Sequence, residues 1–319
     1  LCNCDDPRVS NFFQYFANNF EHLGLKKLIT TCYKSQERDL FSTNDSERAI
    51  WLEYTGDRNG NRVPDPSEIG IHYFNGDGDF RSKECIELLK QADIVVTNPP
   101  FSLFREYVAQ LIEYDKKFLI LGNMNAITYK EIFQYIKKGE LWVGYGFNIS
   151  LVYKAPYENK LEANRKFVKS KGYNPDDNYI KVPAIAWYTN LDISKRHEEL
   201  ILYKSYNYKE YPEYENYDAI NVNRIEDIPV DYYGKMGVPI TFLGKYCPEQ
   251  FEIIGNACDT DWLREVGVKT MGELTIRKLR EQGNKAHVTA NMNSLYIIEM
   301  GKVILPYARI IIKRKKLWK

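Results

Sequence analysis

The chain has 319 residues, of which 44% are hydrophobic and 27% charged, with a formal net charge of +1. This is ordinary for a soluble globular protein, has room for one large α/β domain plus a smaller one, and includes no apolar run as long as a membrane span. The charge balance neither supports nor excludes a nucleic-acid partner, which needs a basic face rather than a basic total.

The six cysteines are scattered, and Cys2-x-Cys4 has no partner pair at zinc-site spacing, so no metal site is predicted. Reduced thiols and a cytoplasmic location are expected. No signal peptide is expected. The sequence lacks an initiator Met and opens inside an apparent strand, so an upstream segment is expected to be missing.

A strand–helix–strand unit opens the chain. Leu1–Asn3 is predicted to end a strand, Ser10 to cap a helix with apolar residues at helical spacing, and Lys27–Cys32 to form the second strand. In a doubly wound sheet the first strand-to-helix turn holds the cofactor. The carboxylates of Asp5 and Asp6 in that turn are able to accept hydrogen bonds from a cofactor amine, with a capping and turn role as the alternative.

Residues 35–75 are polar and are predicted to be irregular. Part of this segment has the spacing of a calcium loop, with oxygen donors at Asp57, Asn59, Asn61, Asp65 and Glu68. The position that requires Gly is Arg62, so a solvated, turn-rich loop is favoured over a calcium site.

The central stretch is a short β-branched run that ends in Asn98-Pro99-Pro100-Phe101. The run predicts a buried parallel strand, and two prolines cannot continue its hydrogen-bonded ladder. The Asn98 side chain and the Pro99 carbonyl are two fixed acceptors, suited to both hydrogens of a planar amine. Phe101 offers a face on which a flipped base is able to stack. The alternative is a strand end that carries a proline turn.

Strands and helices alternate around this stretch, which predicts a mostly parallel sheet. Helices are predicted at Lys83–Lys90, Leu103–Tyr114 and Tyr129–Lys137. Strands are predicted at Lys117–Gly122, Glu140–Val143 and Ile149–Tyr153. Asp79 or Ser82 is able to cap the first of these helices. Tyr145 and Phe147, in a Gly-rich turn, either face a flipped base or pack in the core.

The pattern changes near residue 155. Lys160–Lys171 is charged and predicts a helix or a mobile arm, and the tyrosine-rich segment Tyr203–Tyr217 is predicted to lie in a loop or on the surface. Further strands are predicted at Val182–Asn190, Val238–Leu243, Phe251–Gly255 and Ile304–Ile312. The basic end, Lys313–Lys316, is either a solvated tail or a phosphate-binding segment.

The motif Asn98-Pro99-Pro100-Phe101 resembles the catalytic motif of S-adenosylmethionine-dependent amino methyltransferases. Longer stretches resemble the EcoRI-type adenine-specific DNA methyltransferases, and the resemblance covers nearly the whole chain. These stretches are Cys2–Arg8 with Ser10-Asn11-Phe12, Gly76–Ser82, and Gly237–Leu243.

The resemblance implies a Rossmann-like, doubly wound methyltransferase sheet with a smaller C-terminal target-recognition region. The cofactor-binding catalytic domain is expected at residues 1–155 and the DNA-binding region at 156–319. The expected catalytic residues are Asn98, Pro99, Pro100 and Phe101. The residues expected to bind S-adenosylmethionine are Asn3, Asp5, Asp6, Ser10, Asn11, Phe12, Tyr33, Asp79, Phe80 and Asn98. Asp79 would accept from the cofactor's adenine and Phe80 would stack on it. The acid that usually holds the ribose at the end of the second strand is absent, since the sequence there is Thr31-Cys32-Tyr33-Lys34.

The expected reaction is methylation of adenine N6 in a short duplex site. The expected partners are double-stranded DNA and a cognate restriction endonuclease that acts on the same site, with the enzyme as a monomer. The alternatives are transfer to cytosine N4, transfer to a protein glutamine, and a DNA-binding protein with an inactive site.

Overall fold

A computed structural model describes residues 1–4, 10–33, 49–61, 64–65, 67–155, 157, 160–283 and 294–316. The described chain mixes helices and strands and divides into two compact units. Unit 1 comprises Leu1–Met124 and Leu141–Leu191, and unit 2 comprises Asn125–Glu140 and Asp192–Lys319. Within the described ranges, no helix is both long enough and apolar enough to cross a membrane.

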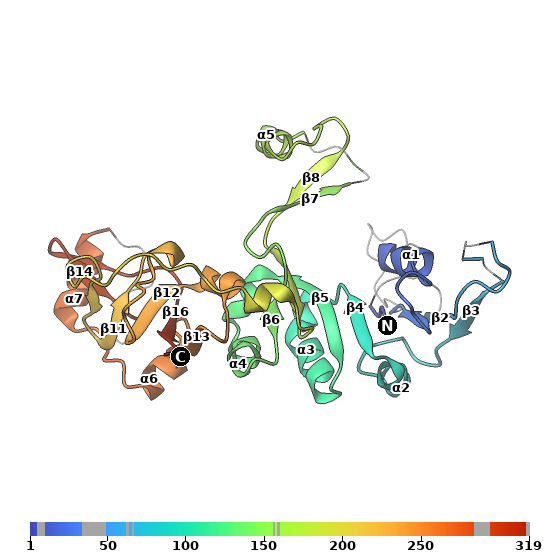
Figure 1. The fold of residues 1–319 in the computed structure, drawn as a ribbon, viewed down its shortest axis with the longest axis horizontal. Coiled ribbons are helices and arrows are strands. Elements are labelled where there is room, and N and C mark those ends of the chain that lie inside the picture. The colour runs from blue at the N-terminus through green and yellow to red at the C-terminus, as the bar shows by residue number, and fades with distance from the viewer. Residues whose placement is uncertain are drawn as a thin grey trace. The chain divides into compact units, whose positions relative to one another are not determined.

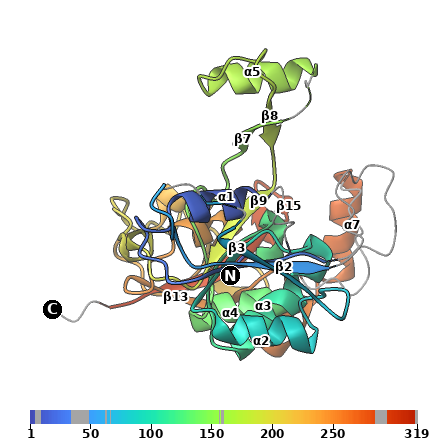
Figure 2. The ribbon, with the colours of Figure 1, turned by 90° about the vertical axis from the view of Figure 1, so that its right-hand side faces the viewer.

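Unit 1 contains a main sheet with helices on both faces. Its described helices are α1 (Asn11–Asn18), α2 (Lys83–Gln91), α3 (Phe104–Glu113) and α5 (Glu162–Ser170). Its described strands are β1 (Leu28–Thr31), β2 (Ile50–Tyr54), β3 (Ile69–Tyr73), β4 (Ile94–Thr97), β5 (Lys117–Asn123), β6 (Trp142–Val143), β7 (Leu151–Lys154), β8 (Tyr179–Val182) and β9 (Ile185–Thr189). Helix α1 lies on one face of the main strands, and α2 and α3 lie on the other (Figures 1 and 2).

Residues Leu1–Asn3 lie between β1 and β4, run parallel to both strands and are hydrogen-bonded to both. The Cys2 amide donates to the Ile29 carbonyl at 2.8 Å, and the Val96 amide donates to the Leu1 carbonyl at 2.9 Å. Strand β4 pairs in parallel with β5, and β9 pairs antiparallel with both β5 and β6. The strands therefore follow one another in the order β3-β2-β1, residues 1–3, β4-β5-β9-β6. Four neighbouring segments in the middle of this order, namely β1, residues 1–3, β4 and β5, run parallel to one another.

Unit 2 is built on the five-stranded sheet β10-β11-β12-β16-β13. Its described helices are α4 (Lys130–Lys138), α6 (Thr260–Glu265) and α7 (Glu273–Glu281). Its described strands are β10 (Glu213–Tyr214), β11 (Tyr217–Asn221), β12 (Lys235–Pro239), β13 (Phe251–Asn256), β14 (Ile297–Glu299), β15 (Lys302–Ile304) and β16 (Arg309–Arg314). Helix α4 packs on β13, and its Lys130 Nζ lies 3.0 Å from Asp261 Oδ2 in α6. Residues 125–140 thus belong to the fold of the C-terminal segment.

The prediction of an irregular segment at 35–75 is wrong where the structure describes it, because β2 and β3 form a hairpin there. Strand β3 is half-buried or exposed along its length, so it lacks the apolar run that marks a core strand. The loop between the two strands bonds to itself. Glu68 Oε1 accepts from the Arg58 amide at 2.6 Å and the Asn59 amide at 3.1 Å. A turn-rich loop, as favoured over a calcium site, fits these contacts.

The prediction of a mostly parallel sheet is also wrong. Among the described strand pairs, only β4–β5 and β11–β12 are parallel, and the others are antiparallel. The hairpin β2–β3 is antiparallel, β7 and β8 pair antiparallel across the segment that contains α5, and β9 runs opposite to β5 in the main sheet. The predicted strand Val182–Asn190 is in fact two strands that meet at Ala184, whose φ is +60°.

Two tyrosines of the segment predicted to lie at the surface are buried. Tyr203 and Tyr208 are 67% and 72% exposed, as expected, but Tyr211 and Tyr214 are only 4% and 5% exposed. Both buried hydroxyls have partners, since Tyr211 donates to the Asp227 carbonyl at 2.8 Å and Tyr214 to Asn221 at 2.9 Å. A tyrosine with a satisfied hydroxyl is a good core residue.

Several element bounds also differ from their predictions. The stretch predicted as strand Val238–Leu243 leaves β12 at Pro239 and continues as the 3₁₀ helix Ile240–Lys245. The predicted strand Ile304–Ile312 is interrupted between β15 and β16. The charged segment Lys160–Lys171 contains helix α5. The two compact units do not coincide with a division at residue 155, but that division concerns which residues bind cofactor and DNA, and it stays a prediction.

Candidate active site

The predicted catalytic motif lies at the carboxyl end of β4. Val95 and Thr97 are fully buried, the strand ends at Thr97, and Asn98 is exposed at its end. Pro99 is buried, and Phe101 is 39% exposed at the start of the 3₁₀ helix Phe101–Leu103 that leads into α3. The chain therefore leaves the sheet at Asn98, as predicted, and presents an amide and an aromatic ring within four residues.

Asn3, at the end of the segment 1–3, is hydrogen-bonded to the end of β4 and to α3. Its backbone carbonyl accepts from the Thr97 hydroxyl, and its side-chain oxygen accepts from the Tyr107 hydroxyl. Asn3 is 4% exposed, and Thr97 and Tyr107 are fully buried. Burial raises the pKa of Tyr107 well above its ordinary value, so the hydroxyl stays protonated and acts as a donor. These contacts fix the strand ends on which Asn98 depends.

The start of α1 supplies three of the expected cofactor residues. Ser10 is 2% exposed, and its hydroxyl caps α1 by accepting from the Phe13 amide at 3.1 Å. Asn11 is exposed, and the Phe12 ring packs edge-on against Trp187 of β9, with ring centroids 6.4 Å apart. Asp5 and Asp6, predicted in the same turn, lie outside the described residues.

The loop Gly76–Phe80 holds an ion pair. Arg81 donates to both carboxylate oxygens of Asp79, with Nε–Oδ1 at 2.9 Å and Nη2–Oδ2 at 2.7 Å. These hydrogen bonds lower the pKa of Asp79, so its carboxylate is charged at neutral pH. Arg81 also lies 3.0 Å from Glu106 of α3. Ser82, not Asp79, caps α2, since its hydroxyl accepts from the Cys85 amide at 3.2 Å.

Phe80 and Gly78 tie this loop to the sheet. The Phe80 ring is only 5% exposed and lies edge-on to Tyr107, with ring centroids 5.0 Å apart. Gly78 has φ +77°, and a Cβ built on it would lie 2.4 Å from the Cys32 carbonyl oxygen. The loop is thus held against the end of β1, next to Tyr33, which is 49% exposed.

The structure brings several predicted residues together through partners that the sequence analysis did not single out. Asn3 and Phe80 both contact Tyr107, and Asn98 follows the Thr97 that binds Asn3. Tyr107 carries a usable signal, because it falls on the buried face of α3 with Phe104 and Leu111. The sequence holds no comparable signal for Arg81, apart from its position two residues after Asp79. In the Gly-rich turn, Phe147 is 8% exposed, which supports packing, and Tyr145 is 59% exposed.

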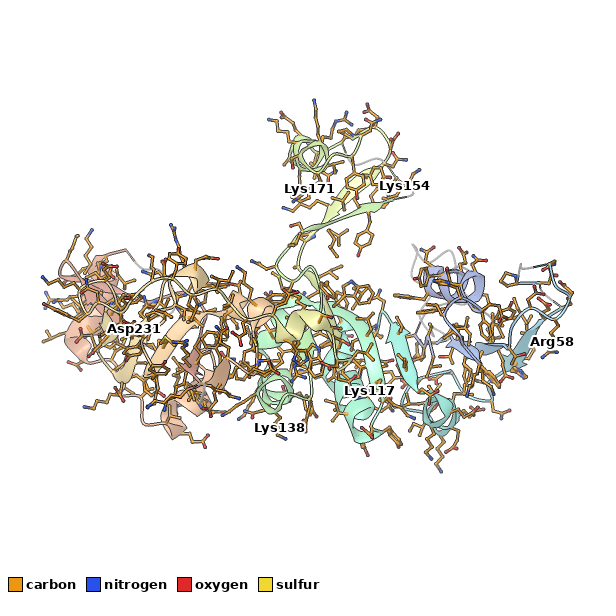
Figure 3. The ribbon with its side chains drawn as sticks, in the orientation of Figure 1. Arg58, Lys117, Lys138, Lys154, Lys171 and Asp231 are labelled. Carbon is orange, nitrogen blue, oxygen red and sulfur yellow. The ribbon has the colours of Figure 1, made fainter. Side chains whose placement is uncertain are left out.

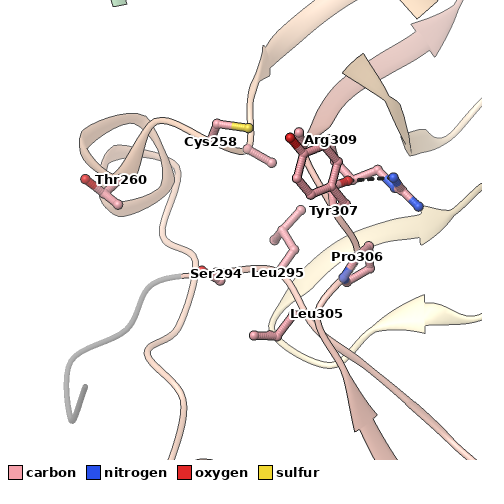
Figure 4. Close-up of a pocket in the computed structure, with 10 residues that line it drawn as sticks. Cys258, Thr260, Ser294, Leu295, Leu305, Pro306, Tyr307 and Arg309 are labelled. Carbon is pink, nitrogen blue, oxygen red and sulfur yellow. Dashed lines mark hydrogen bonds between the residues drawn. The ribbon is translucent and has the colours of Figure 1, made fainter. Parts of the chain in front are cut away.

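A cavity of about 310 Å³ lies in unit 2, away from the catalytic motif in sequence (Figure 4). Its lining includes Cys258, Leu295 and Arg309. The guanidinium is already occupied, since it donates to the Tyr307 carbonyl at 2.6 Å and to Asn221 Oδ1 at 3.2 Å. This arginine therefore braces β16 and β11, and the cavity has no residue of the predicted site in its lining.

Comparison with known proteins places the chain in a family. A sequence model described as "Adenine-specific methyltransferase EcoRI" matches residues 1–315. The chain is 51% identical over 256 residues to the type II methyltransferase M.EcoRI of Escherichia coli, covering 79% of this chain and 77% of that protein. It is 41% identical over 268 residues to the type II methyltransferase M.MgeORF184P of Mycoplasma genitalium, covering 80% and 74%. It is 40% identical over 258 residues to M.MpnI of Mycoplasma pneumoniae, covering 80% and 73%.

No solved structure has significant similarity to the chain. The mixed α/β fold is consistent with a methyltransferase, and the family decides against the cytosine and protein-glutamine alternatives. From the sequence match and the relatives together, the chain belongs to the EcoRI family of adenine-specific methyltransferases and is a site-specific DNA methyltransferase of the restriction–modification type.

Proposed function

We propose that Asn98 and the Pro99 carbonyl bind the N6 amine of an adenine flipped out of duplex DNA, and that Phe101 stacks on the base. The observation that carries this proposal is the exposed Asn98 at the end of a buried strand. Two acceptors that hold both amine hydrogens direct the nitrogen lone pair out of the ring and toward an electrophilic methyl group. Transfer is then direct, and no covalent enzyme intermediate is needed.

The proposed methyl donor is S-adenosylmethionine, whose sulfonium supplies an activated methyl group. Support comes from the strand order. After residues 1–3 the chain forms β1 on one side of that segment and later forms β4 on its other side, so the strand order reverses there. Doubly wound sheets bind ligands at such a reversal, outside the carboxyl ends of the strands. We infer a Rossmann-like arrangement from the four neighbouring parallel segments β1, residues 1–3, β4 and β5.

The residues at this edge suit that donor chemically. The charged Asp79 carboxylate is a natural acceptor for the donor's amino groups, and exposed Tyr33 is able to cover its adenosine part. We propose that Phe80 stacks on the donor's adenine; its ring is 5% exposed and packs edge-on against Tyr107, which fixes its position. Asn3, Asp5, Asp6, Ser10, Asn11 and Phe12 complete the proposed donor site.

The region beyond residue 155 is proposed to contact double-stranded DNA and choose the sequence, while residues 1–155 bind the donor and perform catalysis. A monomer suits methylation of one strand at a time. A cognate endonuclease that cuts the same site without a stable complex, and a cytoplasmic location, follow from the restriction–modification role.

The test is single-molecule sequencing of DNA from a host that expresses the protein, with Asn98→Ala as the matched variant. Wild type should leave N6-methyladenine at one short motif. Asn98→Ala should lose it, with turnover lower by about 100-fold or more and an unchanged thermal unfolding midpoint. Near-wild-type turnover in the variant would remove Asn98 from the mechanism. Calorimetric titration with S-adenosylmethionine separates an enzyme from an inactive DNA-binding protein, which should bind none.

A further inference from the structure

Residues 151–182, which we call the basic arm, concentrate positive charge. The arm comprises β7, α5 and β8 (Figures 1 and 2). Its 32 residues contain seven of the 44 lysines and arginines but four of the 43 aspartates and glutamates. The other 287 residues therefore hold 37 basic and 39 acidic residues. The arm carries +3 on a chain that is otherwise slightly acidic.

The fold of the arm is held by strand pairing and by side chains of α5. Strands β7 and β8 pair antiparallel. Asn164 of α5 holds β8, since its Nδ2 donates to the Tyr179 carbonyl at 3.1 Å and its Oδ1 accepts from the Lys181 amide at 2.8 Å. Arg165 pairs with Asp176 at 2.7 Å, and Lys166 pairs with Glu162 at 2.6 Å.

All six lysines of the arm are exposed, among them Lys154, Lys171 and Lys181, and Figure 3 labels the first two of these three. Lys171 and Lys181 converge on the ring of Phe167, with Nζ atoms 5.7 and 4.6 Å from its centroid. Exposed aromatic rings accompany them: Tyr153 and Tyr173 are each 43% exposed, and Tyr157 is 59% exposed. Cations interleaved with aromatics are typical of nucleic-acid-binding surfaces.

The strand register fixes where the arm is inserted. It leaves the main sheet after β6 and returns at β9. Ile185, the first residue of β9, pairs with Asn123, the last residue of β5. Because β4 and β5 are parallel, that end of β5 is at the same edge of the sheet as the end of β4, where Asn98 lies. Both ends of the arm are therefore attached at the edge that carries the catalytic motif.

We propose that the basic arm binds the phosphate backbone of duplex DNA next to the target base. This rests on the proposed function, in which duplex DNA reaches Asn98. The phosphates of a duplex bound at that edge lie close to the arm, because the arm is inserted at the same edge. The positive charge of the arm is attracted to these phosphates. Its contacts are to phosphate and sugar, so they contribute affinity and register but no sequence choice.

The test compares two triple variants with the same change in charge. The arm variant replaces Lys154, Lys171 and Lys181 with Gln. The control variant replaces three exposed lysines of unit 1 with Gln, namely Lys26 just before β1, Lys90 in the last turn of α2 and Lys117 at the start of β5. These three lie toward the amino ends of the strands, and Figure 3 labels Lys117.

The probe is a fluorescein-labelled 30-base-pair duplex of mixed sequence, titrated by anisotropy at several KCl concentrations. The arm variant should lose affinity and show a log Kobs–log[KCl] slope shallower than wild type by about 2–3, since each lost phosphate contact removes roughly 0.9. The control variant should stay close to wild type. Binding of S-adenosylmethionine by calorimetry should be equal in all three proteins, which shows that the arm variant is folded.

An unchanged slope in the arm variant, or equal changes in both variants, would overturn the arm proposal while leaving the proposed function intact. If wild type neither binds the duplex nor methylates DNA, the proposed function and the arm proposal both fail.

Discussion

Gly78 offers the sharpest test of how the loop Gly76–Phe80 is held, because the chain provides a matched control. Gly78 and Gly60 have nearly the same φ, +77° and +80°. A Cβ on Gly78 would lie 2.4 Å from the Cys32 carbonyl oxygen, whereas nothing lies within 4 Å of a Cβ on Gly60. Alanine at either position pays for the left-handed conformation, but only Gly78→Ala also meets the backbone.

The left-handed conformation costs a non-glycine residue about 1–2 kcal/mol, offset by about 0.4–1 kcal/mol because alanine restricts the unfolded chain. Gly60→Ala should therefore lower the free energy of unfolding by roughly 0–1.6 kcal/mol. Gly78→Ala should lose about 1–3 kcal/mol more, the usual cost of forcing an atom into filled space.

The assay is urea unfolding followed by tryptophan fluorescence, with S-adenosylmethionine titrated into each folded protein. Gly78→Ala should weaken donor binding, because a displaced loop moves Asp79, and Gly60→Ala should not. Equal losses of stability at the two glycines would refute the close approach of Gly78 to the end of β1.

Two further predictions concern the contacts around this loop. Tyr107→Phe removes the hydroxyl that donates to Asn3 and leaves a buried acceptor unpaired, so urea unfolding should show a loss of about 1–3 kcal/mol. Tyr15→Phe, on a ring that is 57% exposed, should change it by less than about 0.5 kcal/mol, and equal effects would contradict the buried bond. Arg81→Gln removes the partner that lowers the pKa of Asp79. A carboxyl with a lowered folded pKa stabilises the protein above its unfolded pKa and loses that contribution as pH falls through the folded pKa. Wild type should therefore lose more unfolding free energy than Arg81→Gln below about pH 4, and parallel pH profiles would disprove the link.

Local patterns predicted much of the framework of unit 1. The β-branched run at 94–97 and the two prolines gave the end of β4, and Ser10 gave the start of α1. These features depend on residues close in sequence, so they can be read without knowing what lies nearby in space.

What the sequence analysis missed depends on residues far apart in the chain. The bond from Tyr107 to Asn3 spans 104 positions, and nothing near either residue reveals the other. Strand β3 is partly exposed, so its role comes from pairing with β2 rather than from its own composition. Arg81, which pairs with Asp79, also contacts Glu106 of α3, 25 positions later in the chain.

The position of α4 constrains how unit 2 can be exchanged among relatives. The chain passes between the two units at residues 124–125, 140–141 and 191–192. A single crossover at residue 191 would leave α4 from one parent packed on β13 from the other, with Lys130 facing a foreign α6. Recombination can transfer this unit whole only by moving two separated stretches together. If this unit holds the sequence choice, as proposed for the region beyond residue 155, point substitution is the simpler route by which a new specificity can arise on this scaffold.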